Sequence, residues 1–539
     1  MMSACESRSR ETGGLRWLAR LLAVALVICV APAAAFAHAA LIATDPADGA
    51  VLAQSPARFS LTFSEPVSPL VLNLVRPDGT VLPLTAFHLD DHTVVVDNPA
   101  PLARGTHVLS WRVVSADGHP VAGSILFSLG APSAAPAATE SVDWNLRAAI
   151  WLARVALYAG LFLGIGGAFA LSFLAGGGRD GKRFVATALL AGLAAAPLSL
   201  GLQGLDALGA PLTHILTPAI WRAALETTFR FTIWIALAAL LLGLLALMLP
   251  RAGKVLSLAA LLGTGLALAA SGHAGAADPQ WLMRSMVFLH GIGIAFWCGA
   301  LAPLGLALKR RAPGATAFLR RFSFSILPVV AILVIAGVVL AIVQVGTPSA
   351  LLTTAYGNLL SAKLVLLAGL FSLAALNRWK LTAPAEASHA GSSRNLVRSI
   401  GVEIFLVLAV FGVAAGWRFT PPPRALALAA AQPAAIHIHT AKAMADLSLA
   451  PGHTGPVTAS IMLMTGDFGP LDAKAVTLVL SKPDSGIEAI RREAHKAGDG
   501  TWRVDGLVVP LAGRWMVRLD ILVSDFDMVT LKDAIAIRP

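Results

Sequence analysis

Charged residues are scarce in this sequence. Asp, Glu, Lys and Arg together make up only 13% of the 539 residues, whereas soluble domains usually carry about 25%. Hydrophobic residues make up 56%, and 48 glycines add to the apolar share. This composition excludes a simple soluble enzyme and indicates several membrane-spanning segments with polar domains attached.

Cysteine is also scarce, and several motifs are missing. Only Cys5, Cys29 and Cys298 occur, and the first two lie in a predicted leader, so we expect no intramolecular disulfide in the mature chain. The absence of a Walker A motif argues against ATP-driven pumping by this chain. The sequence has no Cys-x-x-Cys-His haem motif and no nucleophile constellation. We therefore expect that the protein is not an enzyme.

The first 37 residues have the pattern of a signal peptide. Four arginines between Arg8 and Arg20 precede an apolar run from Leu21 to Val30, which is too short to span a bilayer, and Ala35-Phe36-Ala37 is a cleavage signal. Cleavage there leaves His38 as the first mature residue and exports the segment that follows. A retained N-terminal anchor is the alternative.

Residues 38–130 show the pattern of an all-β domain, a sandwich or a barrel. Short runs of alternating apolar residues recur between turns rich in Pro, Gly, Asp and Asn, which is typical of such folds. The runs are Arg58–Phe63, Val71–Val75, Thr93–Val96, His107–Val114 and Ser124–Leu129. A linker at 131–144, rich in Pro, Ala and Ser at its start, ends this domain.

Four ordered motifs in this domain resemble the periplasmic copper-binding family CopC. They are His38-Ala-Ala-Leu, Asp45-Pro-Ala-Asp-Gly, Leu61-Thr-Phe-Ser-Glu-Pro-Val and the run from Trp111 to Gly123. The resemblance implies a Cu(II) site made by the positions that match the family's ligands, His38, Asp117 and His119, with Glu65 nearby.

Coordination chemistry agrees with that expectation. An N-terminal His offers both its amine and its ring nitrogen to one metal, and a second imidazole with a carboxylate completes a tetragonal N/O set that suits Cu(II). By itself, Asp117-Gly118-His119-Pro120 would also fit an ordinary turn. No Met occurs between Met2 and Met248, which excludes a thioether site in this domain. We interpret His88, His92 and His107 as surface or strand residues.

Residues 145–418 predict a polytopic helical block of about eight spans in the lipid bilayer. Most of the apolar stretches have 18 or more residues, enough to cross about 30 Å, and the fourth is short. They are 147–173, 184–205, 229–249, 255–271, 284–307, 322–345, 359–377 and 397–416.

Loop charges predict the orientation of this block. The four loops expected in the cytoplasm hold fourteen Lys and Arg residues with their borders, and the three opposite loops hold one, Arg222. We therefore expect a multi-pass protein of the cytoplasmic membrane, with both β domains on the periplasmic side. The bias also accounts for much of the net charge of +11, so no nucleic-acid partner is needed.

Polar and soft side chains inside the spans suggest a copper path. His273 follows the fourth span, and Met283, Met286 and His290 share one face of the fifth. Thioethers and imidazoles are suitable ligands for Cu(I). Alternatively, the methionines fill packing gaps and the histidines form hydrogen bonds between helices.

The block also resembles the CopD copper-transport family. The matching runs are Ser271–Ala274, His290–Leu301, Arg321–Ser323, Tyr356–Lys363, Asn377-Arg378 and Glu403. The resemblance implies that His273 and His290 belong to a copper path. We expect Lys363 and Glu403 to form a structural or gating ion pair.

After a linker at 419–434, residues 435–539 predict a second all-β domain, a sandwich that resembles the YtkA-like family. The expected strands are Val457–Met464, Ala475–Leu480, Thr501–Val504 and Trp515–Leu522. His437 and His439 share one strand face and are candidate metal ligands, or else a solvent-exposed pair in the linker. Met462 and Met464 also share a face, for which we favour core packing.

These features predict copper binding outside the cytoplasmic membrane and copper transport across it, with import as the expected direction. Copper ions, Cu(II) in the first domain and Cu(I) in the membrane path, would be the cargo, with a reductase or a copper chaperone as partner. One alternative is a protein that sequesters or senses copper and uses the spans as an anchor. The other is a membrane oxidoreductase in which paired histidines bind haem.

Overall fold

The computed structural model describes residues 41–46, 50–63, 66–99, 101–114, 120–131, 133, 143–386, 390–431, 433–440, 442–466, 469–524 and 527–538. Within these ranges the chain forms a β domain, a helical block and a second β domain, in that order. This order confirms the predicted fold class. The predicted signal peptide lies outside the described residues.

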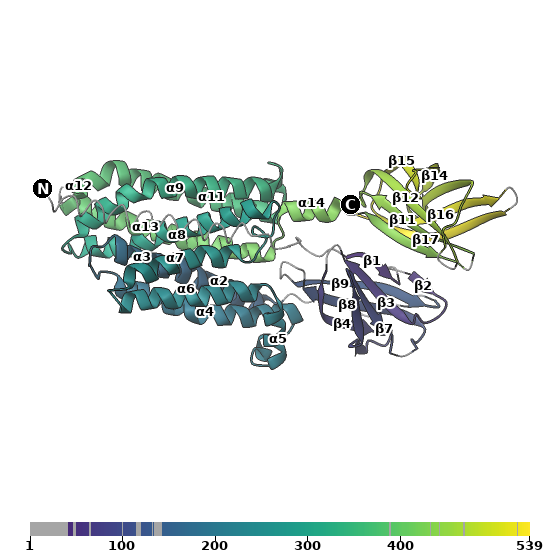
Figure 1. The fold of residues 1–539 in the computed structure, drawn as a ribbon, viewed down its shortest axis with the longest axis horizontal. Coiled ribbons are helices and arrows are strands. Elements are labelled where there is room, and N and C mark those ends of the chain that lie inside the picture. The colour runs from purple at the N-terminus through teal and green to yellow at the C-terminus, as the bar shows by residue number, and fades with distance from the viewer. Residues whose placement is uncertain are drawn as a thin grey trace. The chain divides into compact units, whose positions relative to one another are not determined.

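The first β domain is a sandwich of two sheets. One sheet has the strand order β1-β3-β7-β6 and the other β2-β9-β8-β4-β5 (Figure 1). The strands are β1 (Leu41–Asp45), β2 (Ala50–Leu52), β3 (Arg58–Phe63), β4 (Ser68–Val75), β5 (Val81–Pro83), β6 (Phe87–Asp90), β7 (Thr93–Asp97), β8 (Gly105–Val114) and β9 (Pro120–Leu129).

Alternation along β3 builds the core of this sandwich. Phe59, Leu61 and Phe63 are fully buried, while the residues between them are partly exposed. The Phe63 ring packs edge-on against Trp111 of β8, with 5.1 Å between ring centroids. A Cβ on Gly123 of β9 would lie 2.4 Å from the Trp111 ring. Only glycine therefore leaves room for this tryptophan.

The helical block consists of long apolar helices joined by short ones (Figure 1). Asp143 starts the first by accepting hydrogen bonds from the backbone N–H groups of Asn145 and Leu146. The long segments are α2-η1-α3 (Trp144–Phe173), α4 (Lys182–Leu208), α6 (Phe229–Met248), α7 (Gly253–Ala269), α8 (Gln280–Lys309), α9 (Ala315–Val345), α11 (Ala355–Leu376) and α13 (Ala390–Gly416). The short ones are η2 (Leu212–His214), α5 (Pro218–Glu226), α10 (Ala350–Thr353), η3 (Asn377–Leu381), α12 (Thr382–Glu386), η4 (Trp417–Phe419) and α14 (Pro423–Ala431).

Among the described residues, 7 helices are long and apolar enough to cross a membrane, compared with about eight expected spans. The fourth expected span is α7, whose 17 residues reach about 25 Å at 1.5 Å per residue. This helix packs against both α6 and α8 and buries most of its polar and small residues. The expected eight are therefore seven long spans and one short apolar helix within the bundle.

Small residues let the helices approach closely. A Cβ on Gly166 of α3 would lie 1.8 Å from the carbonyl oxygen of Ala295 in α8, and one on Gly299 of α8 would lie 2.2 Å from the backbone of Gly166. Such contacts are favourable in a bilayer, where dispersion forces at close range replace the hydrophobic effect between helices. They hold α8, which carries the predicted copper ligands, against the first span.

The second β domain is one eight-stranded sheet in the order β10-β11-β12-β15-β14-β13-β16-β17. Its first and last strands also contact each other, so the sheet nearly closes into a barrel around the buried Trp515. The strands are β10 (Ala434–His439), β11 (Ala443–Ala450), β12 (Gly455–Thr465), β13 (Ala475–Lys482), β14 (Ile487–Lys496), β15 (Trp502–Val509), β16 (Gly513–Ser524) and β17 (Asp527–Ile537), with the short helix η5 (Pro483–Ser485).

Candidate functional site

The predicted Cu(II) ligands of the first domain, His38, Glu65, Asp117 and His119, lie outside the described residues. Each of them is within three residues of a described strand end, at Leu41, Phe63, Val114 or Pro120. The ligand set itself stays a prediction.

Two contacts connect the start of β1, the end of β3 and Trp111 of β8 within the sandwich. Leu41 at the start of β1 pairs with Phe63 at the end of β3, and Phe63 packs on Trp111 near the end of β8. These parts of β1, β3 and β8 therefore lie close together, although they come from three separate stretches of sequence.

The other histidines of this domain occupy ordinary positions. His107 is fully buried, its ring stacks on Phe127 with 5.4 Å between centroids, and its Nε2 lies 2.8 Å from the carbonyl oxygen of Ala103. His88 is an exposed residue of β6, and His92 lies 3.3 Å from the carboxylate of Asp91. The interpretation of these three as strand or surface residues is confirmed.

His290 forms a hydrogen bond between two helices of the membrane block. Its Nδ1 donates to the carbonyl oxygen of Leu333 in α9, at 3.1 Å. Gly337, one turn further along α9, makes room for the ring, because a Cβ there would lie 3.1 Å from the imidazole. Since Nδ1 carries the proton, Nε2 keeps the lone pair that a metal requires. The geometry fits both the predicted ligand and the alternative of a helix-linking histidine.

His273 lies in the segment between α7 and α8, and this segment is fixed to the same helix α9. Gln344, which is 2% exposed, donates from its Nε2 to the carbonyl oxygen of His273 at 3.1 Å. Gln344 follows Leu333 by eleven residues, which is about 16 Å along the helix axis. His273 and His290 are therefore near α9 at different depths. On the same face of α8 as His290, Met283 is fully buried and Met286 is half-buried.

The predicted ion pair between Lys363 and Glu403 is wrong. Glu403 is 3% exposed and accepts a hydrogen bond from Asn377 Nδ2 at 2.5 Å. The Lys363 ammonium lies over the Trp417 ring, 4.9 Å from its centroid. No ion pair joins the two residues within the described part of the chain: Glu403 contacts the buried Asn377, and Lys363 lies over the half-buried Trp417.

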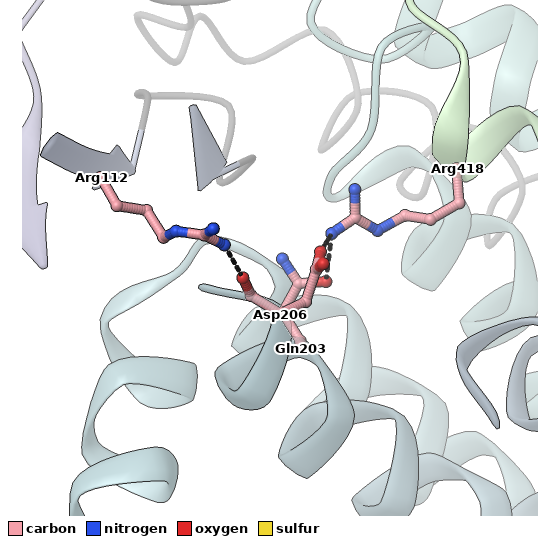
Figure 2. Close-up of polar contacts among 4 residues, drawn as sticks. All are labelled: Arg112, Gln203, Asp206 and Arg418. Carbon is pink, nitrogen blue, oxygen red and sulfur yellow. Dashed lines mark hydrogen bonds and ion pairs between the residues drawn. The ribbon is translucent and has the colours of Figure 1, made fainter. Parts of the chain in front are cut away.

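A polar cluster at the C-terminal end of α4 has no counterpart among the sequence predictions. The Asp206 carboxylate forms an ion pair with Arg418, which also contacts Gln203 at 3.3 Å, and Arg112 donates to the Asp206 carbonyl oxygen at 2.5 Å (Figure 2). Cations are favoured where the carbonyl groups of a helix end. With two guanidinium groups and one carboxylate, the cluster is suited to holding chain segments together and repels a copper cation. The sequence signal that could have indicated this cluster is Asp206 itself, an aspartate at the end of an apolar span.

In the second β domain, His437 lies opposite Asp446, and Asp446 lies opposite Met462 on the next strand. The His437 Nδ1 is 2.6 Å from Asp446 Oδ1. Met462 is 46% exposed, so core packing is the wrong interpretation for this residue, because the face of β12 that carries it is not the core face. His439 lies in β10 opposite Met444. Residues 437 and 439 belong to a strand, so the linker alternative does not apply to them.

Conventional metal clusters are absent from the described part of the chain. No three His, Cys, Asp or Glu side chains gather there in a way that could hold a metal ion. Cys298 is a free, buried thiol of α8.

Two family models match the chain. The CopC domain matches residues 41–130, and the model described as copper resistance protein D matches residues 316–417. The second match covers α9 to α13. His273, Met283, Met286 and His290 precede it, so this match does not reach the predicted copper path.

Curated relatives extend the comparison. The chain is 26% identical to the copper transport protein CutJ of Bacillus subtilis (strain 168), over 96% of this chain and 98% of CutJ. It is 36% identical over 116 residues to copper resistance protein C of Xanthomonas campestris pv. juglandis, covering 20% of this chain and 91% of that protein. The corresponding protein of Pseudomonas syringae pv. tomato is 34% identical and 84% covered, over 18% of this chain.

Solved structures similar to the chain cover its first domain. CopC from Methylosinus trichosporium OB3b is 27% identical over 18% of this chain and 95% of that chain, with a TM-score of 0.16. PcoC, a methionine-rich copper resistance protein from Escherichia coli, is 27% identical over 17% of this chain and 99% of that chain, with a TM-score of 0.15.

Proposed function

We propose that this chain, which belongs to the CopC and CopD copper-resistance families, binds copper outside the cytoplasm and carries it across the membrane, with import as the direction. The observation that carries the proposal is the union of a CopC domain and a multi-span block in one polypeptide. The similarity to a copper transport protein along 96% of the chain supports it.

The proposed route begins in the periplasm. His38, Asp117 and His119 hold Cu(II) with nitrogen and oxygen donors, and Glu65 lies near them. Reduction to Cu(I) precedes entry, with the electron supplied by a reductase outside this chain, and a copper chaperone is the other proposed partner. The ion then meets His273 and the soft donors Met283, Met286 and His290.

Neither alternative function is favoured by the described structure. A protein that only sequesters or senses copper needs a single anchoring span, whereas the described residues of this chain include 7 helices long enough to cross. A haem bound by His273 and His290 requires both rings at one depth, on opposite sides of one iron. The α9 residues that contact them, Leu333 and Gln344, are about 16 Å apart along the helix axis, which does not favour one iron between the two rings.

Radiocopper uptake into cells with and without the chain tests the proposal. We expect higher accumulation in cells that express the protein. Lower accumulation on expression would contradict import and favour export or sequestration.

The His290→Ala variant tests the route itself. We expect it to abolish the accumulation while leaving expression and Cu(II) binding by the first domain intact, because His290 is remote from that domain's ligands in sequence and lies inside the membrane block. The His92→Ala variant changes a half-buried histidine of the first domain, outside the predicted ligand set, and should match the unmodified protein. Normal transport by both His290→Ala and His273→Ala would show that the two histidines serve packing only.

A further inference from the structure

Three side chains form a row across neighbouring strands of the second β domain. His437 on β10, Asp446 on β11 and Met462 on β12 are in direct cross-strand register, so adjacent members have Cβ atoms about 5 Å apart. All three are exposed, whereas the next residues along each strand, such as Ile438 and Leu463, are buried. The row therefore occupies the outer face of the sheet.

This row lines an open pocket of about 300 Å³. The other polar residues around the pocket are Ser448, Ser460 and Thr501. Thr501 donates two hydrogen bonds to Asp499 Oδ1, at 2.6 Å from its hydroxyl and 3.0 Å from its backbone N–H. These bonds lower the pKa of the Asp499 carboxyl below its ordinary value. Asp499 lies outside the pocket lining and pairs with Arg503 at 3.9 Å, so the carboxylate that favours a cation in this pocket is that of Asp446.

The contact between His437 and Asp446 has the geometry that orients a metal-binding imidazole. A carboxylate accepts, so Nδ1 of His437 is the donor in the 2.6 Å contact with Asp446 Oδ1. The lone pair is then on Nε2. Carboxylate partners of this kind set the tautomer of a metal-binding histidine and raise its basicity.

Met462 supplies a soft donor two strands from that imidazole, on the other side of Asp446. With 46% of its surface exposed, the thioether is available at the pocket and does not serve to fill the core. Imidazole and thioether together select copper among the common metals, and Cu(I) in particular.

We propose that His437 Nε2 and Met462 Sδ bind one Cu(I) ion in this pocket, with Asp446 as the positioning residue. The choice of copper rests on the proposed function, and the donor set rests on the strand register alone. With one imidazole and one thioether donor on an open surface, the ion remains accessible to incoming ligands. The pocket is therefore a place where Cu(I) is held and exchanged outside the membrane block.

The same domain offers matched controls within the described residues. Met516 is 45% exposed and lies opposite Ala534, with no histidine in its row. His495 lies 3.6 Å from the carboxylate of Asp505 and opposite Arg503, with no methionine opposite it. Each control residue thus reproduces one half of the proposed site.

Cu(I) titration of the full-length chain in detergent, without oxygen and against a chromophoric chelator, tests the site. We expect Met462→Leu and His437→Ala each to lose one Cu(I) equivalent, with loss of sulfur scattering at the copper absorption edge in Met462→Leu. Met516→Leu and His495→Ala should keep the original stoichiometry. Unchanged stoichiometry in both Met462→Leu and His437→Ala would overturn the proposal.

Asp446 is tested separately from the two donors. Asp446→Ala should weaken this equivalent by about 10- to 100-fold, and Asp446→Asn should restore most of it, because the amide oxygen still accepts from Nδ1. Equal affinity in all three proteins would overturn the positioning role.

Radiocopper uptake distinguishes this inference from the proposed function. If Met462→Leu keeps every Cu(I) equivalent while uptake depends on the chain, the pocket is not a copper site and the proposed function stands. If Met462→Leu loses one equivalent while uptake is independent of the chain, the pocket is confirmed and the transport proposal fails.

Discussion

The two β domains would bind copper with different donor atoms. In the first, the predicted ligands are an N-terminal residue and residues between strands, His38, Glu65, Asp117 and His119, all with nitrogen or oxygen donors. In the second, the proposed ligands are His437 on β10 and the sulfur of Met462 on β12, with Asp446 of β11 between them. The difference teaches that the oxidation state a domain prefers depends on its donors, since hard and borderline donors suit Cu(II) and thioethers suit Cu(I).

Lowering the pH should produce the largest difference in copper affinity between the two sites. Copper binding at the first requires an amine and two imidazoles in their neutral forms, and at the second a single imidazole, since a thioether takes up no proton. Below the pKa values of its ligands, each protonatable donor costs about tenfold in affinity per pH unit. Affinity at the first site should therefore fall by up to about a thousandfold per pH unit, and at the second by about tenfold.

Competition titrations of the full-length chain between pH 7 and pH 5 measure both slopes, with Cu(II) for the first site and Cu(I) for the second. Equal slopes would mean that the amine and the second imidazole do not bind the metal.

A single residue added ahead of His38 should weaken Cu(II) binding at the first site and leave Cu(I) binding at the second site unchanged. The addition moves the free amine away from the imidazole and removes the chelate, so we expect Cu(II) affinity to drop by more than the roughly 100-fold that loss of an outer-shell partner costs. Cu(I) binding that depends on Met462 should be unchanged. Electron paramagnetic resonance with a Cu(II) titration checks the first expectation, and an unaltered Cu(II) spectrum would exclude the amine as a ligand.

The smallest expected effect is that of Met462→Leu on the free energy of unfolding. Comparing it with a substitution on the core face distinguishes the two faces of the second domain's sheet. Met462→Leu changes an exposed side chain and should alter the free energy of unfolding by less than about 0.5 kcal/mol. Trp515→Ala empties a fully buried position and should cost about 3–5 kcal/mol. Thermal unfolding of the two variants measures both. A large loss of stability in Met462→Leu would indicate that this side chain packs in the core.

The regular alternation of apolar and polar residues made many of the strands predictable. The run Arg58–Phe63 coincides with β3, and the expected strands near Val457, Ala475 and Trp515 lie within β12, β13 and β16. By contrast, β14 was not predicted. Its residues, Ile487–Lys496, are mostly exposed and charged, with no alternating apolar pattern, so only pairing with β13 and β15 reveals it as a strand.

Side-chain partners were harder to predict than elements. Lys363 and Glu403 carry opposite charges in neighbouring spans, which suggested a pair, yet Trp417 and Asn377 are their partners. The choice depends on how α11 and α13 are rotated and shifted against each other, and apolar periodicity does not specify that.

The sequence by itself determined the order of domains, the membrane block and the motifs that carry the copper families, because composition, alternation and short motifs are local properties of the chain. Only the tertiary structure decided that Asp446 and Met462 join His437. Met462 is 25 residues from His437 in sequence, and a shift of one residue in the register of β11 against β12 would turn one of the two to the opposite face of the sheet. That register is fixed by the burial of Leu447, Ile461 and their neighbours on the core face, so the packing of the barrel interior sets the geometry of the pocket on its surface.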